Sequence, residues 1–215
     1  MNRSALLLAL LALPGVAAAE GSAVSGKIGT LGWGLEFTGG SSDSLSGRIG
    51  INKYTYKKST TNNSVNYDLK LQLQTVDALV DYYPFHGSFR TTAGLMYNNN
   101  KGDFNGVPDA GGNYTINGTA YPAALVGSLQ GSMSFNKVAP YLGIGWGNPV
   151  AKGKGFGMAT DFGILFQGTP KTSLTTTSTD TGVQSAVATE QAKFQDSVKN
   201  FKYYPVISVA ITYQW

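Results

Sequence analysis

The chain has 215 residues and a formal net charge of +4, and its charged share of 13% is about half of what soluble globular proteins usually carry. It contains no cysteine and a single histidine, His86, which excludes disulfides, thiolate metal sites, cysteine nucleophiles and multi-histidine metal sites. The lysines are scattered along the chain, a distribution that does not indicate nucleic-acid binding. We therefore expect no metal, no cofactor and no nucleic-acid partner.

Residues 1–19 have the three-part pattern of a secretory signal peptide. Arg3 supplies a positive charge, residues 5–13 are an unbroken apolar run, and small residues precede Glu20. The run is too short to cross a ~30 Å hydrocarbon core as a helix, which needs about 20 residues. We predict cleavage after Ala19 and an exported domain over 20–215. Because no later stretch has the length and apolarity of a spanning helix, any membrane residence must use strands.

Apolar residues recur at every second position along most of the mature chain, which predicts β-strands with one apolar face. The predicted strands are 31–37, 45–51, 69–82, 89–97, 129–135, 142–146, 156–166 and 203–215. A further candidate follows the short turn 168–171, which makes nine. Either 22–27 forms an extra strand, giving ten, or one candidate lies outside the barrel wall, giving eight. Within 69–82 the apolar positions change from odd to even numbers. We attribute this change to a β-bulge near Gln74 and Thr75.

Two architectures are compatible with this alternation of apolar and polar residues. A soluble β-sandwich buries the apolar face against a second sheet, whereas a transmembrane barrel turns it toward lipid. The polar face is rich in glycine and small residues, aromatic residues gather near strand ends, and short connections alternate with long ones, as in transmembrane barrels. We predict an all-β, up-and-down antiparallel transmembrane barrel of eight to ten strands. The predicted external loops are 57–66, 98–124, 148–155 and 180–202, and the predicted periplasmic turns are 39–44, 84–88, 136–139 and 168–171.

The end of the chain, ISVAITYQW at 207–215, places apolar residues at every second position before a final aromatic. This pattern resembles the signature of outer-membrane barrels that the barrel-assembly machinery recognises, with Ile211, Tyr213 and Trp215 as the signal. PYLGIG at 140–145 and DFGILF at 161–166 are similar to strands of the small OmpA/OmpW-like barrel families. The resemblance covers essentially the whole mature chain. It implies a porin-like protein of a Gram-negative outer membrane, in contact with lipid and lipopolysaccharide.

Six charged residues fall on the polar face of the predicted strands, and we expect them to point into the lumen. They are Glu36, Arg48, Asp77, Asp81, Arg90 and Asp161. They suit either the selectivity lining of a narrow pore or a network of ion pairs that fills a closed barrel. We favour the network, because side chains usually fill the interior of small barrels.

His86-Gly87-Ser88 is similar to the His-x-Ser pair of lipid A deacylase barrels. A nucleophilic serine needs a base, and the base needs a group that orients it. No carboxylate follows Ser88 until Asp103, and the pair lies in a predicted periplasmic turn. We therefore predict a non-enzymatic protein without catalytic residues.

The external segments contain the remaining signals. Asn117-Gly118 predicts a two-residue hairpin, and residues 182–201 predict a helix with Val187, Phe194, Val198 and Phe201 on one face. That helix is expected on the barrel rim or over the barrel mouth. Five lysines in the predicted external loops are candidates for contact with lipopolysaccharide phosphates. They are Lys57, Lys58, Lys101, Lys152 and Lys154.

Outer-membrane barrels include structural proteins, adhesins, narrow channels and lipid-modifying enzymes, so the class does not fix the function. We favour a non-enzymatic role in envelope structure or surface interaction. The alternatives are a narrow channel for small solutes and a lipid A-modifying enzyme.

Overall fold

The computed structural model describes residues 21–62, 65–150 and 153–215, so the predicted signal peptide lies outside the described residues. Within these ranges the elements are, in chain order, β1 (Ser22–Gly29), β2 (Gly32–Ser42), β3 (Leu45–Asn62), β4 (Val65–Tyr82), β5 (Phe89–Asn98), β6 (Lys101–Val107), β7 (Asn113–Ile116), β8 (Thr119–Pro122), α1 (Ala123–Val126), β9 (Leu129–Ser134), β10 (Val138–Trp146), β11 (Gly155–Phe166), β12 (Lys171–Thr176), α2 (Thr181–Val198) and β13 (Tyr203–Gln214). No helix in the described ranges is long and apolar enough to cross a membrane.

Eight of the strands form a closed antiparallel ring. β4 pairs with both β3 and β5, so the ring runs β4-β3-β2-β1-β13-β11-β10-β5 and returns to β4. The predicted antiparallel barrel is confirmed, and β1, the possible extra strand of the sequence, is one of the eight. Because the polar faces of the eight ring strands point inward, the lumen contains the charged side chains and the outside of the ring is apolar.

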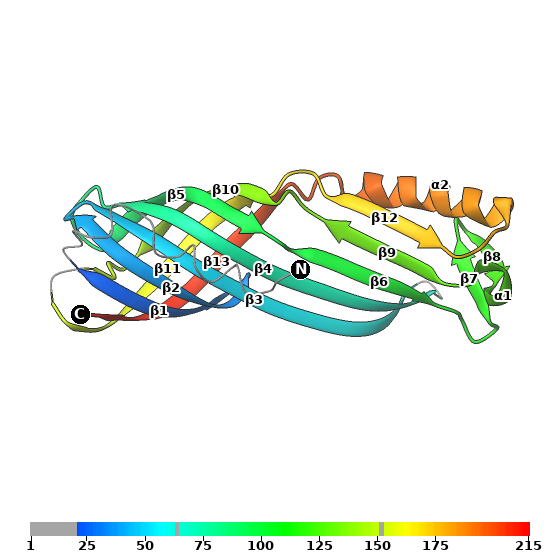
Figure 1. Cartoon of the computed structure of the whole chain (residues 1–215), viewed down its shortest axis with the longest axis horizontal. Helices are drawn as coiled ribbons and strands as arrows, with labels where there is room; N and C mark the ends of the chain where they lie inside the picture. Colours follow the sequence, from blue (N-terminus) through cyan, green and yellow to red (C-terminus); the bar gives the residue numbers. More distant parts are fainter. Residues whose placement is uncertain (1–20, 63–64, 151–152) are drawn as a thin grey trace, which may run out of the picture.

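The sheet continues beyond the ring at one end of the barrel. β4 pairs with β5 along Thr75–Tyr82 but with β6 along Asn66–Gln72, and β9 and β12 follow β6 in the order β12-β9-β6-β4-β3. This projecting part, with the hairpin β7–β8 and both helices, is called the extension below. It occupies the right-hand half of Figure 1.

The predicted bulge in β4 is wrong. The register between β3 and β4 runs without a shift from Leu45 opposite Tyr82 to Asn62 opposite Val65. Since side chains alternate strictly along such a strand, the odd-numbered side chains of β4 face inward over its whole length.

The apolar positions of β4 change between odd-numbered and even-numbered residues at the level where the strand leaves the ring. In the barrel the outward face is apolar, and Val80 is 56% exposed while its inward neighbour Asp81 is buried. In the extension the inward face is apolar, and Leu69 lies opposite Phe104 of β6, on the face that packs against α2. The apolar face therefore changes sides because its surroundings change.

The barrel has two unlike ends. Trp215 donates its backbone N–H to Ser22, and the turns that follow β2 and β4 lie at this same end, called the terminal end below. Gly155 begins β11 opposite Gln214, so the predicted external loop 148–155 also begins and ends here. The four segments predicted as external loops therefore do not all lie at one end of the barrel. β9 of the extension leads directly into β10 of the ring, and β11 of the ring leads directly into β12 of the extension. The connecting segments 136–139 and 168–171, which were predicted as periplasmic turns, therefore lie at the other end of the barrel.

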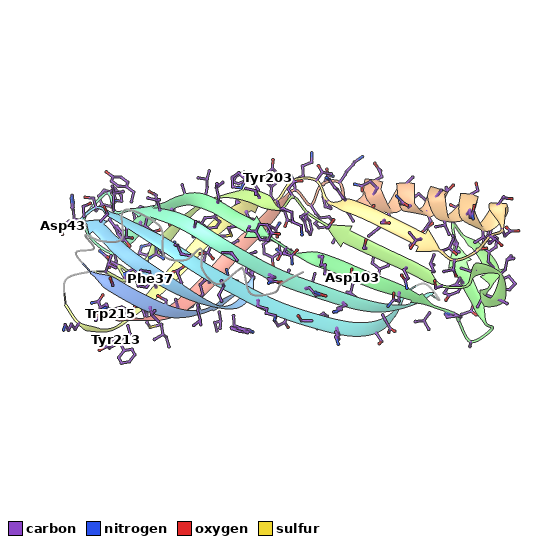
Figure 2. The ribbon with its side chains drawn as sticks, viewed as in Figure 1. Phe37, Asp43, Asp103, Tyr203, Tyr213 and Trp215 are labelled. Carbon is purple, nitrogen blue, oxygen red and sulfur yellow. The ribbon has the colours of Figure 1, made fainter. Side chains whose placement is uncertain are left out.

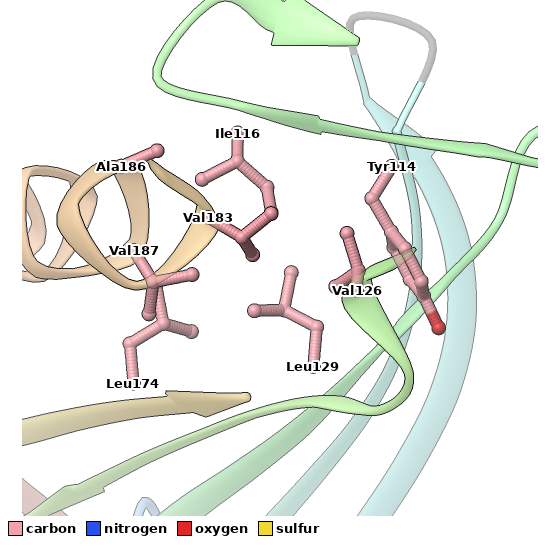
Figure 3. Close-up of a cluster of buried hydrophobic side chains, with 8 residues drawn as sticks. All are labelled: Tyr114, Ile116, Val126, Leu129, Leu174, Val183, Ala186 and Val187. Atoms are coloured by element: carbon pink, nitrogen blue, oxygen red, sulfur yellow. The ribbon is translucent and has the colours of Figure 1, made fainter. Parts of the chain in front are cut away.

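A second hydrophobic core holds the extension together. Its buried side chains come from β7, α1, β9, β12 and α2, and Figure 3 shows them meeting between the helix and the sheet. Asn117 and Gly118 form the predicted hairpin turn with φ of 52° and 80°, values that the type I′ turn requires. Asp180 begins α2 by accepting a hydrogen bond from the Val183 N–H at 2.9 Å.

Helix α2 covers the free edge of β12. The Gln195 side chain accepts hydrogen bonds from the Thr172 N–H at 3.0 Å and from the Thr172 hydroxyl at 2.9 Å, and Gln191 accepts from the Leu174 N–H at 3.4 Å. An uncovered strand edge promotes aggregation, so this contact protects the sheet. The predicted apolar stripe is partly wrong, because the helix ends at Val198 and Phe201 is exposed.

Candidate functional site in the barrel lumen

All six charged residues predicted to face the lumen are buried there, within one connected network. β1 adds a seventh, Lys27, which the sequence analysis missed because 22–27 was only a possible strand. The signal for Lys27 was present, since Ser25 and Lys27 alternate with the outward-facing Val24 and Ile28. Among the residues that the structure describes, three cations therefore meet four carboxylates in the lumen.

Arg48 is the centre of this network. Its guanidinium lies 3.1 Å from the Glu36 carboxylate, 2.7 Å from that of Asp81 and 3.1 Å from that of Asp161. The strands that carry these groups, β2, β4 and β11, are not all neighbours of β3, so Arg48 connects opposite walls of the barrel. Buried arginine pairs of this kind fix geometry, because the planar guanidinium donates in set directions.

Arg90 extends the network toward the terminal end. Its guanidinium lies 2.8 Å from Asp161 and 3.5 Å from Asp81, and it also donates to the backbone carbonyl oxygens of Gly147 and Thr160. A Cβ at Gly145 would lie 2.9 Å from the carbon of this guanidinium. Glycine at 145 therefore leaves the space that Arg90 occupies.

Lys27 forms the other side of the network. Its ammonium nitrogen lies 2.7 Å from Glu36 and 3.3 Å from Asp77, and Asn52 donates to Asp77 at 2.9 Å. Asp77 is thus held by a lysine and an amide, whereas Asp81 and Asp161 are held by the two arginines.

Apolar side chains block the lumen on the side of the extension. This lumen plug consists of Leu31, Leu79, Met96, Ala139, Tyr141, Leu165 and Val206. A cavity of about 20 Å³ lies between the plug and the charged network and has Lys27 and Arg48 in its lining. That volume suits about one water molecule. Arg90 of the charged network and Leu165 of the plug are both fully buried, so solvent reaches neither side chain.

His86 lies at the terminal end, in the turn between β4 and β5, with a positive φ of 53°. Its Nε2 atom lies 3.0 Å from the Ser44 hydroxyl on the neighbouring turn, and the pair is exposed to solvent. This contact engages His86 with a serine other than Ser88. The geometry therefore gives no support to Ser88 as a nucleophile.

The five candidate lysines do not share one surface. Lys57 and Lys101 lie on the outward face of the extension, whereas Lys58 follows Lys57 and points to the opposite face. Lys154 lies beside Gly155 at the terminal end, so it does not share an end of the barrel with Lys57, Lys58 and Lys101. Lys152 lies outside the described residues.

Of the predicted assembly signal, Ile211 and Tyr213 lie on the outward face of β13, and Trp215 directly follows this strand. Ile211, Tyr213 and Trp215 are 61%, 45% and 51% exposed. Their outward direction follows from the two-residue period of the strand, in which Ala210 and Thr212 point inward and are buried.

No family model matches the chain, and no curated protein matches it. Two solved structures from Acinetobacter baumannii are similar to it. CarO has a TM-score of 0.59 and 24% identity, over 92% of this chain and 98% of that one. CarO2 has a TM-score of 0.60 and 20% identity, over 91% of this chain and 98% of that one. The matches do not single out the OmpA/OmpW-like families. Because the overlap includes nearly all of each chain, this protein shares the β-barrel fold of the CarO structures.

Proposed function

We propose that this chain is an integral outer-membrane β-barrel with a closed lumen, and that it has a non-enzymatic role in envelope structure or surface interaction. One observation carries the proposal: buried ion pairs and an apolar plug fill the barrel, while a folded extension projects from one end. A barrel without a passage acts through the surfaces that it presents.

The membrane location is supported by the outward face of the ring. Large apolar side chains there are strongly exposed, including Ile28 at 69%, Met158 at 69% and Leu95 at 54%. Soluble proteins rarely expose a continuous apolar surface of this kind. Aromatic side chains occur near both ends of this surface, with Trp215 at the terminal end and Tyr203 near the extension in Figure 2, as expected for the two interfaces of a bilayer.

Conductance measurements test the closed lumen. Folded protein in planar bilayers is expected to give no steady openings, since Arg48 and the plug occupy the passage. A porin of known conductance, prepared in the same way, is the control. Steady openings of the parent protein, with a conductance that changes when Arg48 or Arg90 is replaced, would contradict the closed lumen and favour a channel.

A narrow channel for small solutes is the second candidate, and two observations favour it. Buried lumen atoms without a hydrogen-bond partner, among them the Ser25 hydroxyl, the Thr38 hydroxyl and one oxygen of Asp77, are sites for ordered water. The four carboxylates also outnumber the three cations, a lining that would favour cations. Such a channel requires Arg48 and the plug to move apart.

A further inference from the structure

The outward face of the extension directly continues the lipid-facing surface of the barrel. Strand register aligns Ile51, Val76, Tyr97 and Val138 side by side across β3, β4, β5 and β10. These four residues form the last apolar row before the extension, and Ile51, Tyr97 and Val138 are 49%, 52% and 60% exposed. The hydrocarbon region is therefore expected to end at this row.

Lysines occupy the rows that follow on the same face. Lys53 lies opposite Gln74 in the first row, and Lys137 joins this level by donating to Asn99. The second row contains Lys101 and Lys171, which both lie opposite Ser134.

The third row contains Lys57 opposite Lys70, with Asp103 next to them on β6. The six lysines of these three rows are called the lysine face below: Lys53, Lys57, Lys70, Lys101, Lys137 and Lys171. Asp103 is the one carboxylate in the same rows among the described residues, and it lies 3.4 Å from Lys101. Figure 2 labels Asp103 on the extension.

The height of these rows matches the headgroup layer. One row equals two residues, or about 6.8 Å along a strand, and barrel strands tilt by about 40°, so each row lies about 5 Å farther from the hydrocarbon. The polar layer of a bilayer leaflet is about 5 to 8 Å thick. Along any one strand, the first two rows therefore lie at or just above headgroup height and the third row above them. The same tilt offsets neighbouring strands of one row by about 3 Å.

The opposite wall of the barrel differs at this end. Within the described residues, no lysine or arginine lies on the outward face of β1, β2, β11 or β13. That wall presents aromatic side chains instead, with Trp33 56% exposed and the rings of Phe166 and Tyr203 5.6 Å apart. The positive charge is thus confined to the wall that rises into the extension.

We propose that the lysine face binds the phosphate groups of lipopolysaccharide in the outer leaflet. The inference rests on the proposed outer-membrane location, because it needs the extension to project on the lipopolysaccharide side. Several ammonium groups at headgroup height, next to an apolar surface for acyl chains, match a phosphorylated lipid in both charge and polarity. Of the lysines predicted from the sequence, Lys57 and Lys101 belong to the lysine face, whereas Lys58 and Lys154 do not. The other four members of the lysine face were not predicted from the sequence.

Two variants with the same charge change test the proposal. One replaces Lys53, Lys57, Lys70 and Lys101 with glutamine. The matched control replaces four exposed lysines away from the lysine face with glutamine: Lys58, Lys154, Lys193 and Lys199. Both proteins are purified folded in detergent, and the heat-dependent shift in gel migration verifies each fold. Binding is measured by titration with lipid A and with dephosphorylated lipid A, and inorganic phosphate is added as a competitor.

The expected result is that the lysine-face variant binds lipid A about tenfold more weakly or worse, whereas the control stays within about twofold of the parent protein. Dephosphorylated lipid A should bind weakly to all three proteins, and millimolar phosphate should not compete. Equal losses in both variants, unchanged binding in the lysine-face variant, or competition by free phosphate would overturn the proposal. Failure of the proposed location is separate: the protein would be absent from outer-membrane fractions whatever its affinity for lipid A.

Discussion

Arg48 contacts three carboxylates from three strands, so its loss leaves Glu36, Asp81 and Asp161 partly unpaired in a buried place. Removing one partner from a buried ionic network costs about 3 to 5 kcal/mol. We expect Arg48→Met to lower the free energy of unfolding by that order, measured by urea titration of the refolded barrel in lipid vesicles.

Two further variants separate charge loss from a change of packing. Arg48→Lys should lie between the parent and Arg48→Met, because lysine keeps the charge without the planar fork. Adding Glu36→Gln to Arg48→Met should restore part of the stability. Equal urea midpoints for Arg48→Met and the parent would show that the network contributes nothing measurable.

At the residue scale, the sequence predicted which charged side chains face inward but not which of them pair. The two-residue period was sufficient to bring all six predicted residues into the lumen. The pairing of Arg48 with Asp161 depends on how the ring closes and staggers, because the two residues are 113 positions apart. The alternation of side chains along a strand contains no information about a contact between residues so far apart in the sequence.

The contact between α2 and β12 gives a prediction for the extension. Gln191→Ala with Gln195→Ala removes the side chains that accept from the Thr172 and Leu174 N–H groups. Each lost hydrogen bond costs about 1 kcal/mol, so amides of α2 and β12 should exchange hydrogen about 5- to 100-fold faster.

The barrel offers an internal control for that experiment. Amides of β1 and β13 should keep their exchange rates, because those strands lie in the ring. Ser185→Ala on the exposed side of α2 should leave α2 unchanged. Unchanged exchange in the double variant would mean that the apolar core alone holds the helix.

At the element scale, the alternation located the barrel strands, and the largest error concerned the extension. Residues 57–66 and 98–124 were predicted as loops, but they contain parts of β3 and β4 and all of β6, β7 and β8. These strands contain lysine, threonine and asparagine on the outward face, which weakens the apolar period that identifies a strand in lipid. The error over β4 has the same origin, since a change of surroundings resembles a bulge.

The orientation of the whole molecule can be tested on cells. An epitope inserted between Asn117 and Gly118, in the β7–β8 turn, should bind antibody on intact cells if the extension is external. The same epitope between Asp43 and Ser44, at the terminal end, should bind only after permeabilisation. The reverse pattern would invert the proposed orientation, and a soluble periplasmic protein would label at neither site without permeabilisation.

The fold as a whole was predictable because lipid imposes a strict rule on strands, with apolar side chains outward and polar side chains inward. The extension follows the opposite rule of soluble proteins and packs its own core around Val183 and Ile116. In the proposed outer-membrane location, lipid surrounds one part of this continuous sheet and water surrounds the other. The outward apolar alternation expected in lipid therefore identified the strands of the ring but not those of the extension.

Along β4 the apolar side chains change from one face of the strand to the other, and the position of this change indicates how deep the barrel lies in the bilayer. Because Val76 belongs to the outward apolar set and Leu73 to the inward one, the proposed outer-membrane location puts the boundary between hydrocarbon and headgroups between these two residues of β4. Loops inserted on the extension side of Leu73 would change the exposed surface of the protein without changing the depth of the barrel in the bilayer. Lengthening the strands on the other side of that boundary would instead create a mismatch with bilayer thickness, which the surrounding lipids would have to absorb.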